Sequence, residues 1–314
     1  PGGPDFTLTP PRNGYVWWYL DGLSDDHAHG ITVIAFLGSV FSPYYALARR
    51  RVGGADPLAH CAMNVALYGR GGKRWAMTER TAATVTRSPD HLAIGPSGMA
   101  WHGDGLEVHI DETSIPWPRR LRGTIRVHPL TVEPHVMHLD PAGRHRWQPI
   151  APCARIEVAM TDPALRWTGS AYLDTNDGDR PLEEDFLRWQ WSRAMIGPDT
   201  AIQYDVTGRS ADTPALRLAL RYDAAGGVRE MVPAPLQAMR RTRWLVDRAV
   251  GGEPDDPARV VETLEDTPFY ARSVVTTVLE GAARTAMHES LSLTRFRRPW
   301  IQAMLPFRMP RRFG

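Results

Sequence analysis

The chain has 314 residues, a length that suits one large domain or two of ordinary size. Hydrophobic residues make up 43% and charged residues 23% of it, which is typical of globular proteins and excludes a disordered, collagen-like or coiled-coil chain. The formal net charge is only +2, so no chain-wide basic field exists to hold nucleic acid, and we expect no nucleic-acid partner.

The first part of the chain consists of short apolar or alternating runs separated by Gly, Pro, Asp and Asn, which predict an all-β sandwich or barrel. The predicted strands are 15–20, 31–41, 61–68, 74–78, 92–94, 99–102, 106–110 and 121–128. One segment, 30–48, carries no charge and approaches the length of a membrane-spanning helix. Its β-branched residues, followed by Gly38 and the Ser42-Pro43 pair, favour a buried strand and a turn instead.

A second set of predicted strands follows residues 131–143, a His- and Pro-rich stretch that is the best candidate for a domain boundary. These strands are 145–149, 154–160, 165–172, 186–194, 200–206, 215–222 and 228–232. After Pro233 the apolar and arginine residues recur at helical spacing. This spacing predicts helices over 236–250, 257–265 and 269–288. We therefore expect a β domain at 1–140, a second β domain at 141–235 and a helical C-terminal segment at 236–314.

The two ends of the chain bear on membrane contact. Residues 1–11 lack the basic start and apolar core of a signal peptide, so we expect no export. The last stretch mixes arginine with aromatic side chains, a combination that suits an anionic membrane surface. Its members are Arg295, Arg297, Arg298, Arg308, Arg311, Arg312, Phe296, Trp300, Phe307 and Phe313. The alternative is a tail that packs on the β domains and shows its arginines to water.

Common catalytic signatures are absent from the sequence, which has no GxSxG, HExxH, P-loop or GxGxxG motif in a suitable context. The run DDHAH at 25–29 offers carboxylates and imidazoles, but no further ligand cluster has a recognisable spacing. Cys61 and Cys153 likewise show no metal or redox spacing. We expect a hairpin turn at 25–29, and no metal or cofactor.

Aromatic residues concentrate in the second strand set: Trp147, Trp167, Phe186, Trp189, Trp191 and Tyr204. Ordinary core is one interpretation. A lined pocket is the other, because residues two apart on a strand share a face, as Tyr172 and Asp174 do, and that face could be a barrel interior. Indole faces beside a carboxylic acid are the components needed to form and hold a carbocation, through proton donation and cation–π attraction.

Several strings together resemble the carotenoid 1,2-hydratase family, also called hydroxyneurosporene synthase. They are WWYLDGLSDDHAHGITVIAFLGSVFSPYYALARR, HCAMNVALYG, RWAMTERT, GSAYLDTNDGDRPLEEDFLRWQWSRA and LEDTPFYARS, and the similarity runs from about Tyr15 to Arg295. The resemblance implies a cofactor-independent enzyme of bacterial carotenoid synthesis. It would add water across the terminal 1,2 double bond of lycopene, neurosporene and related acyclic carotenes. It also implies two lipocalin-like (calycin) antiparallel β-barrels, in agreement with the two strand sets.

The family's functional positions are an H-x-W element and a Y-x-D element, which occur here as HRW at 145–147 and YLD at 172–174. By this resemblance we expect Asp174 to protonate C2 of the carotene, leaving a tertiary cation at C1. Burial among indoles favours the protonated form of a carboxylic acid. Trp147 would face the cation, Tyr172 would orient the proton, and His145 would position the incoming water and accept its proton.

Further aromatic residues complete the expected site. Trp191, Trp189, Trp167 and Tyr204 are predicted to bind substrate, with Trp191 also near the cation. A C40 polyene is longer than a strand, so only its end group needs to enter a small barrel. The rest would lie in a groove between domains or in lipid. We therefore expect peripheral contact with the cytoplasmic side of the photosynthetic or inner membrane. The alternatives are a carotenoid or lipid carrier without catalysis, and a cyclase or isomerase of the same architecture.

Overall fold

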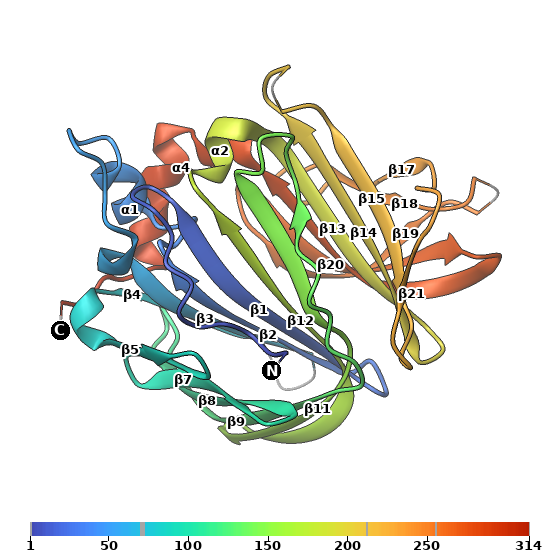
Figure 1. Cartoon of the computed structure of the whole chain (residues 1–314), viewed down its shortest axis with the longest axis horizontal. Helices are drawn as coiled ribbons and strands as arrows, with labels where there is room; N and C mark the ends of the chain where they lie inside the picture. Colours follow the sequence, from blue (N-terminus) through green and yellow to red (C-terminus); the bar gives the residue numbers. More distant parts are fainter. Residues whose placement is uncertain (1, 70–72, 212, 255, 314) are drawn as a thin grey trace. The chain divides into compact units, whose positions relative to one another are not determined.

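Two compact units make up the chain. The computed structural model describes residues 2–69, 73–211, 213–254 and 256–313. Unit 1 comprises Pro1–His138, Gly143–Pro181 and Ala303–Gly314, and unit 2 comprises Leu139–Ala142 and Leu182–Gln302. Figure 1 labels the strands and helices of both units.

An antiparallel sheet forms unit 1. Its strands are β1 (Tyr15–Ser24), β2 (His29–Leu37), β3 (Cys61–Gly69), β4 (Arg74–Arg80), β5 (Val85–Ser88), β6 (His91–Ile94), β7 (Ser97–His102), β8 (Gly105–Thr113), β9 (Arg120–Pro129), β10 (Met137–His138), β11 (His145–Asp162) and β12 (Ala164–Gly178). They follow the order β4-β3-β2-β1-β12-β11-β9-β8-β7-β6-β5, and β10 pairs with β11. Strand β9 alternates exposed and buried residues along its length, the pattern of a half-buried strand.

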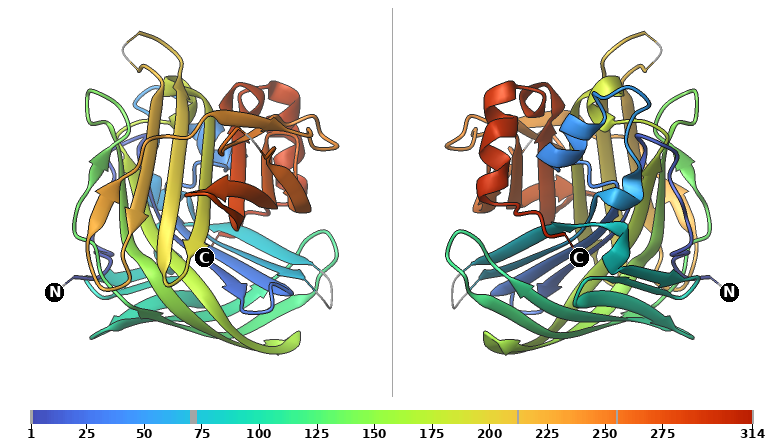
Figure 2. Two further views of the ribbon diagram at one scale, coloured as in Figure 1. Left: turned by 90° about the vertical axis from the view of Figure 1, so that its right-hand side faces the viewer. Right: turned by 90° about the vertical axis from the view of Figure 1, so that its left-hand side faces the viewer.

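The hydrophobic core of unit 1 lies inside this curled sheet. It joins apolar residues from distant positions in the strand order, such as Met63 of β3 and Leu92 of β6. Residues so far apart can share one core because the sheet curves around them, as the blue to green strands do in Figure 2. On β1 the core residues are Val16, Trp18 and Leu20. The odd-numbered residues of β1 therefore point to the opposite face of the sheet.

Unit 2 is built on a second antiparallel sheet, with the strand order β16-β15-β14-β13-β21-β20-β19, and on a separate β17–β18 pair. The strands are β13 (Phe186–Ile196), β14 (Asp199–Gly208), β15 (Leu216–Tyr222), β16 (Val228–Glu230), β17 (Leu236–Met239), β18 (Arg248–Gly251), β19 (Arg259–Asp266), β20 (Tyr270–Leu279) and β21 (Ala282–Ser292). An apolar cluster that includes Ala194, Val250 and Val275 packs β18 against one face of the larger sheet.

Helices are short. They are α1 (Pro43–Ala48), η1 (Pro57–Ala59), η2 (Ala82–Thr84), α2 (Leu182–Asp185), α3 (Leu293–Phe296), α4 (Pro299–Met304) and η3 (Leu305–Phe307). Helix α1 begins where Ser42 caps it, since the Ser42 hydroxyl accepts the Tyr45 N–H at 3.0 Å. Within the described residues, none of the helices combines the length and hydropathy needed to cross a bilayer. The uncharged segment 30–48 is instead mostly β2, a turn and α1.

The mainly-β prediction is confirmed, and each strand predicted between residues 15 and 232 corresponds to an observed strand. The predicted strands 145–149 and 154–160 form one long strand, β11, because two register shifts between Gln148 and Ala154 let it continue. Strands β5 and β10 were not among the predicted strands.

The predicted helices at 236–250, 257–265 and 269–288 are wrong, because these residues form β17 to β21. The segment YARSVVTTVL of β20 shows the reason. Its Val and Thr residues favour a strand, and β20 pairs with neighbours on both sides. Among the described residues after 236, helix is confined to short turns at α3, α4 and η3.

The units also differ from the predicted division at residue 140. Strands β11 and β12 belong to the first sheet, where β12 pairs with β1 and β11 pairs with β9. Each sheet is open and ends in two edge strands. These are β4 and β5 in the first sheet, and β16 and β19 in the second. Two closed barrels are therefore not confirmed.

The C-terminal tail covers the β4 edge of unit 1. Glu79 of β4 donates its backbone N–H to Pro310 O and accepts the Arg312 N–H, each at 2.9 Å. Arg311 forms an ion pair with the Glu79 carboxylate, and its Nη2 donates to Ala59 O at 3.0 Å. This part of the tail therefore packs on the β structure, as one of the two alternatives expects, although Arg311 pairs with Glu79 instead of facing water. Pairing of an edge strand also blocks edge-to-edge aggregation.

Candidate active site

The predicted H-x-W and Y-x-D elements meet on one face of the unit 1 sheet. Strand β12 lies between β1 and β11, with Asn176 opposite both Trp17 and Trp147. Directly opposed residues of antiparallel strands point to the same side. This face is opposite to the hydrophobic core, because Leu173 of β12 is a core member and Asp174 is not. The expectation that Tyr172 and Asp174 face a barrel interior is therefore wrong.

Hydrogen bonds from three side chains converge on the Asp174 carboxyl group. The Tyr172 hydroxyl donates to Oδ2 at 2.7 Å, and the Trp147 indole Nε1–H lies 3.0 Å from the same oxygen and 3.1 Å from the Tyr172 hydroxyl. The Asn176 amide Nδ2 donates to Oδ1 at 3.3 Å. All four side chains are buried, with Trp147 and Tyr172 fully so. The carboxyl group is thus held in one orientation in a site shielded from water.

His145 is fully buried. At the end of β12, Gly178 is opposite His145 on one side and opposite Tyr15 on the other. Its Nδ1 lies 2.9 Å from the Tyr15 hydroxyl, and the two rings stack at 5.9 Å between centroids. The structure thus joins Trp147, Tyr172 and Asp174 directly, and it places His145 on the same face of β11 as Trp147, in contact with Tyr15. A carboxyl group, an imidazole and an indole so arranged can supply an acid, a base and a π surface.

Trp167 does not join this group. It lies on β12, but an odd number of residues from Asp174, so it points to the other face. There it packs against the core of unit 1.

Trp189, Trp191 and Tyr204 belong to unit 2. Trp191 of β13 is paired with Tyr204 of β14, and the Trp189 and Tyr204 rings meet at 5.1 Å in an edge-on contact. All three side chains are buried. Their share in substrate binding stays a prediction.

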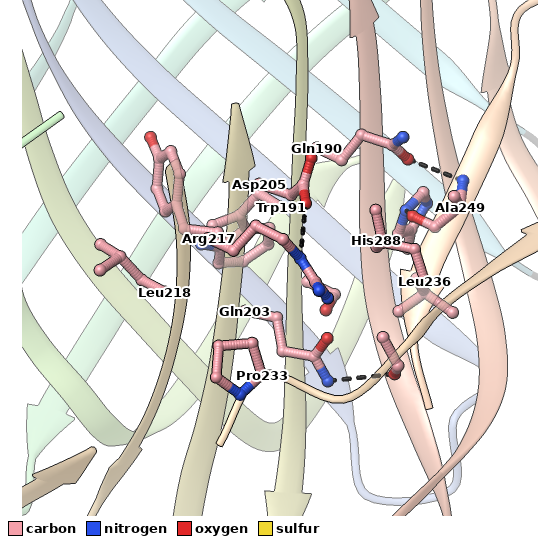
Figure 3. A pocket seen from close by; sticks show the side chains of 14 residues that line it. Gln190, Trp191, Gln203, Asp205, Arg217, Leu218, Pro233, Leu236, Ala249 and His288 are labelled. Atoms are coloured by element: carbon pink, nitrogen blue, oxygen red, sulfur yellow. Dashed lines mark hydrogen bonds and ion pairs between the residues drawn. The ribbon is translucent and has the colours of Figure 1, made fainter. Parts of the chain in front are cut away.

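A small pocket in unit 2 has Trp191 and Tyr204 among its lining residues. Its polar side chains mostly bind one another or the backbone, as Asp205 and Arg217 do in Figure 3. The Arg217 Nε–H donates to Asp205 Oδ2 at 3.0 Å, and the Gln203 side-chain amide donates to Gly251 O at 3.1 Å. Burial raises the pKa of Asp205, and the Arg217 charge opposes this shift. These bonds tie the strands of unit 2 together, so we assign the pocket a structural role.

His288 in this pocket predicts a pH dependence of stability. Its Nε2–H donates to Ala249 O at 2.8 Å, its Nδ1 has no partner among the described residues, and burial lowers its pKa to about 4. Below about pH 6.5, His288 binds a proton in the unfolded chain but stays neutral in the folded chain. The free energy of unfolding therefore falls by about 3 kcal/mol as the pH is lowered towards 4. Urea unfolding of wild type and His288→Gln should differ in this slope. Parallel pH curves would contradict the assignment.

The DDHAH run is a hairpin turn between β1 and β2, as predicted. Asp25 pairs with Arg155 at 2.7 Å, and Asp26 accepts the Ser24 hydroxyl at 2.6 Å. These hydrogen bonds hold the pKa of both carboxyl groups below the usual range. Across the described ranges, no three His, Cys, Asp or Glu side chains gather as metal ligands would.

Three further residues complete the site without having been predicted from the sequence: Tyr15, Asn176 and Gly178. The sequence did contain a pattern that indicates Tyr15. The run YVWWYL places Tyr15, Trp17 and Tyr19 at every second position of β1, and this spacing indicates an aromatic face. The Tyr19 ring meets the Tyr172 ring edge-on at 6.1 Å.

Comparisons with known proteins give the family of this chain. Residues 33–314 match the family model for carotenoid hydratase CrtC. The acyclic carotenoid 1,2-hydratase of Thiocapsa roseopersicina is 54% identical, over 98% of this chain and 76% of the relative. That of Rubrivivax gelatinosus is 48% identical, over 99% of this chain and 77% of the relative. A solved structure of a protein assigned as AttH, from Nitrosomonas europaea, shares the fold with a TM-score of 0.62 at 15% identity, covering 90% of this chain and 92% of its own. The chain belongs to the carotenoid hydratase CrtC family.

Proposed function

We propose that this chain hydrates the terminal C1=C2 double bond of acyclic carotenes such as lycopene and neurosporene. One observation carries the proposal: a buried carboxyl group, Asp174, is held by the Tyr172 hydroxyl and the Trp147 indole on a single face of the sheet. Two relatives that match nearly the whole chain are named acyclic carotenoid 1,2-hydratase. We further propose that the two sheets are open relatives of lipocalin-like barrels.

The reaction begins with a proton moving from Asp174 to C2 of the alkene. Protonation at C2 leaves a tertiary cation at C1, the more stable of the two possible cations. In this proposal the buried Asp174 carries the proton before the reaction starts. The two donors at Oδ2, Tyr172 and Trp147, then stabilise the carboxylate as the proton leaves. The site thus holds the proton and also lowers the barrier to its release.

The cation is stabilised by its surroundings until water arrives. The carboxylate left on Asp174 attracts the positive charge, and the indole of Trp147 supplies an electron-rich ring beside it. Burial of the site keeps bulk water out.

Water then forms a bond from its oxygen to C1, and His145 accepts the proton that water loses. His145 then gives up this proton, and Asp174 takes up one proton before the next turnover, so that both groups return to their starting states. The sum is addition of one water with no net transfer of electrons, so we propose that the reaction needs no redox cofactor.

The proposal is tested by incubating purified protein with detergent-dispersed lycopene or neurosporene, without added cofactor, and recording the mass of the polyene. A gain of one water supports it. Binding without a change of mass would point to a carotenoid carrier. A new product of unchanged mass would point to a cyclase or isomerase. Either of these results contradicts the proposal.

We also propose that the protein meets its water-insoluble substrate at the cytoplasmic face of the photosynthetic or inner membrane. The C-terminal tail supplies suitable groups. Phe307 and Phe313 are each 77% exposed, while Arg308 stacks over the Trp75 ring at 4.8 Å. Phe296, by contrast, is buried, so it belongs to the fold. Exposed aromatic and arginine side chains favour an anionic bilayer surface.

The membrane proposal predicts a specific loss. The double variant Phe307→Ser with Phe313→Ser should bind vesicles containing phosphatidylglycerol several-fold more weakly in flotation assays, because two interfacial anchors are gone. Trp117→Ser is the matched control, since Trp117 is 78% exposed but lies outside the tail, between β8 and β9. Equal losses in the tail variant and the control, or no loss in either, would contradict the assignment.

A further inference from the structure

We infer that Tyr15 is a positioning residue for hydration, acting through His145. The inference deepens the proposed function and rests on the base role given there to His145. The Tyr15 hydroxyl lies 2.9 Å from His145 Nδ1, and the exposed fractions of the two residues are 1% and 0%. They come from β1 and β11, which are not adjacent in the sheet, since β12 lies between them.

A glycine makes this contact possible. Gly178 of β12 is opposite Tyr15 on one side and opposite His145 on the other. A Cβ atom at position 178 would lie 2.5 Å from the Tyr15 ring and 2.8 Å from His145 Nδ1. Real Cβ atoms essentially never come so close to other atoms, so any side chain here would push the pair apart. The absence of a side chain at 178 lets two residues meet across an intervening strand.

Stacking fixes the Tyr15 ring itself. The ring lies against Trp17 at 5.0 Å with an interplanar angle of 17°, and against His145 at 5.9 Å with an angle of 25°. A tyrosine held between two rings presents its hydroxyl in a constant direction. The Tyr15 ring therefore orients the His145 imidazole by stacking, in addition to the hydrogen bond.

The hydrogen bond selects the reactive form of His145. A histidine that takes a proton from water needs one ring nitrogen with a lone pair and the other carrying a hydrogen. If Nδ1–H donates to the Tyr15 oxygen, Nε2 keeps the lone pair and is the basic nitrogen. The same bond strengthens when the ring becomes imidazolium, because a charged donor binds its acceptor more tightly. In this arrangement Tyr15 sets the tautomer of His145 and stabilises the imidazolium that forms when the ring takes the proton from water.

The first test is Tyr15→Phe, which keeps the ring and removes the acceptor. We expect kcat to fall roughly tenfold to a hundredfold, by analogy with metal sites, where losing a partner that orients a ligating histidine has an effect of this size. The acid limb of the kcat/KM pH profile should move to lower pH, because the imidazolium loses a stabilising bond. Tyr45→Phe is the control, since its buried hydroxyl donates to Gly14 O at 2.7 Å, in the same unit. It should lower stability without moving the pH profile.

A double-mutant cycle tests whether Tyr15 acts through His145. His145→Gln alone should be impaired, and adding Tyr15→Phe to it should cause no further loss. Gly178→Ala should move the pH profile in the same direction as Tyr15→Phe. Multiplying losses in the double variant, or an unmoved profile in Tyr15→Phe, would overturn the inference while leaving the proposed function intact. Full turnover by His145→Gln would instead overturn the base assignment, and the inference with it.

Discussion

Replacing Asp174 with Asn is expected to lower carotene turnover by about a thousandfold while leaving the fold intact. The amide oxygen can still accept hydrogen bonds from Tyr172 and Trp147, so the local structure has the means to persist. What the amide lacks is a proton acidic enough to move to an alkene carbon. Turnover of dispersed lycopene or neurosporene, followed by chromatography, measures the effect.

A matched carboxylate on the same strand serves as the control. Asp177 lies three residues from Asp174, which places its side chain on the opposite face of β12, and it accepts the Arg146 Nε–H at 2.7 Å. Asp177→Asn should retain most of the turnover. A normally folded Asp174→Asn protein that still hydrates carotene would exclude Asp174 as the acid.

The second large effect is on stability, at the edge of unit 1. Arg311→Ala is expected to lower the free energy of unfolding by about 3–5 kcal/mol. Arg311 is the ion-pair partner of Glu79, whose exposed fraction is 1%, and its Nη1 lies 2.8 Å from His60 Nδ1. Removing Arg311 takes the arginine charge away from the buried Glu79 carboxylate and leaves His60, with its Nδ1 2.9 Å from Oε1, as the remaining side-chain partner. Equilibrium unfolding in urea measures the loss.

Two companion variants separate charge from tail packing. Arg312→Ala removes an exposed arginine of the same tail and should cost well under 1 kcal/mol. Adding Glu79→Gln to Arg311→Ala should recover part of the loss, because the buried charge is then gone. An Arg311→Ala protein as stable as Arg312→Ala would show that the buried pair contributes little.

Local sequence pattern was enough to predict much of the fold, while the family resemblance supplied the residues of the candidate site. Alternating runs marked the strands, and the two-residue spacings of His145 with Trp147 and of Tyr172 with Asp174 placed each pair on one strand face. The same parity argument places Trp167 on the other face, five residues before Tyr172, so its assignment to the site was avoidable.

The rest depended on contacts that local pattern does not contain. The bond between Tyr15 and His145 joins residues 130 positions apart, and it depends on the register of two strands against Gly178. The strands β17 to β21 carried a helix-like spacing of apolar residues, yet pairing within the sheet decided their structure. The tail pairing with Glu79 is likewise a long-range contact.

Isotopic labelling tests most directly whether Asp174 protonates C2 and water adds to C1. Wild-type protein and Asp174→Asn are incubated with an acyclic carotene in D₂O and, separately, in water enriched in ¹⁸O, and the products are located by mass spectrometry and NMR. Hydration with Asp174 as the acid predicts one deuterium bound to C2 and one ¹⁸O bound to C1 with wild type, and neither with Asp174→Asn. Product that lacks deuterium at C2, or equal labelling by the variant, would contradict it.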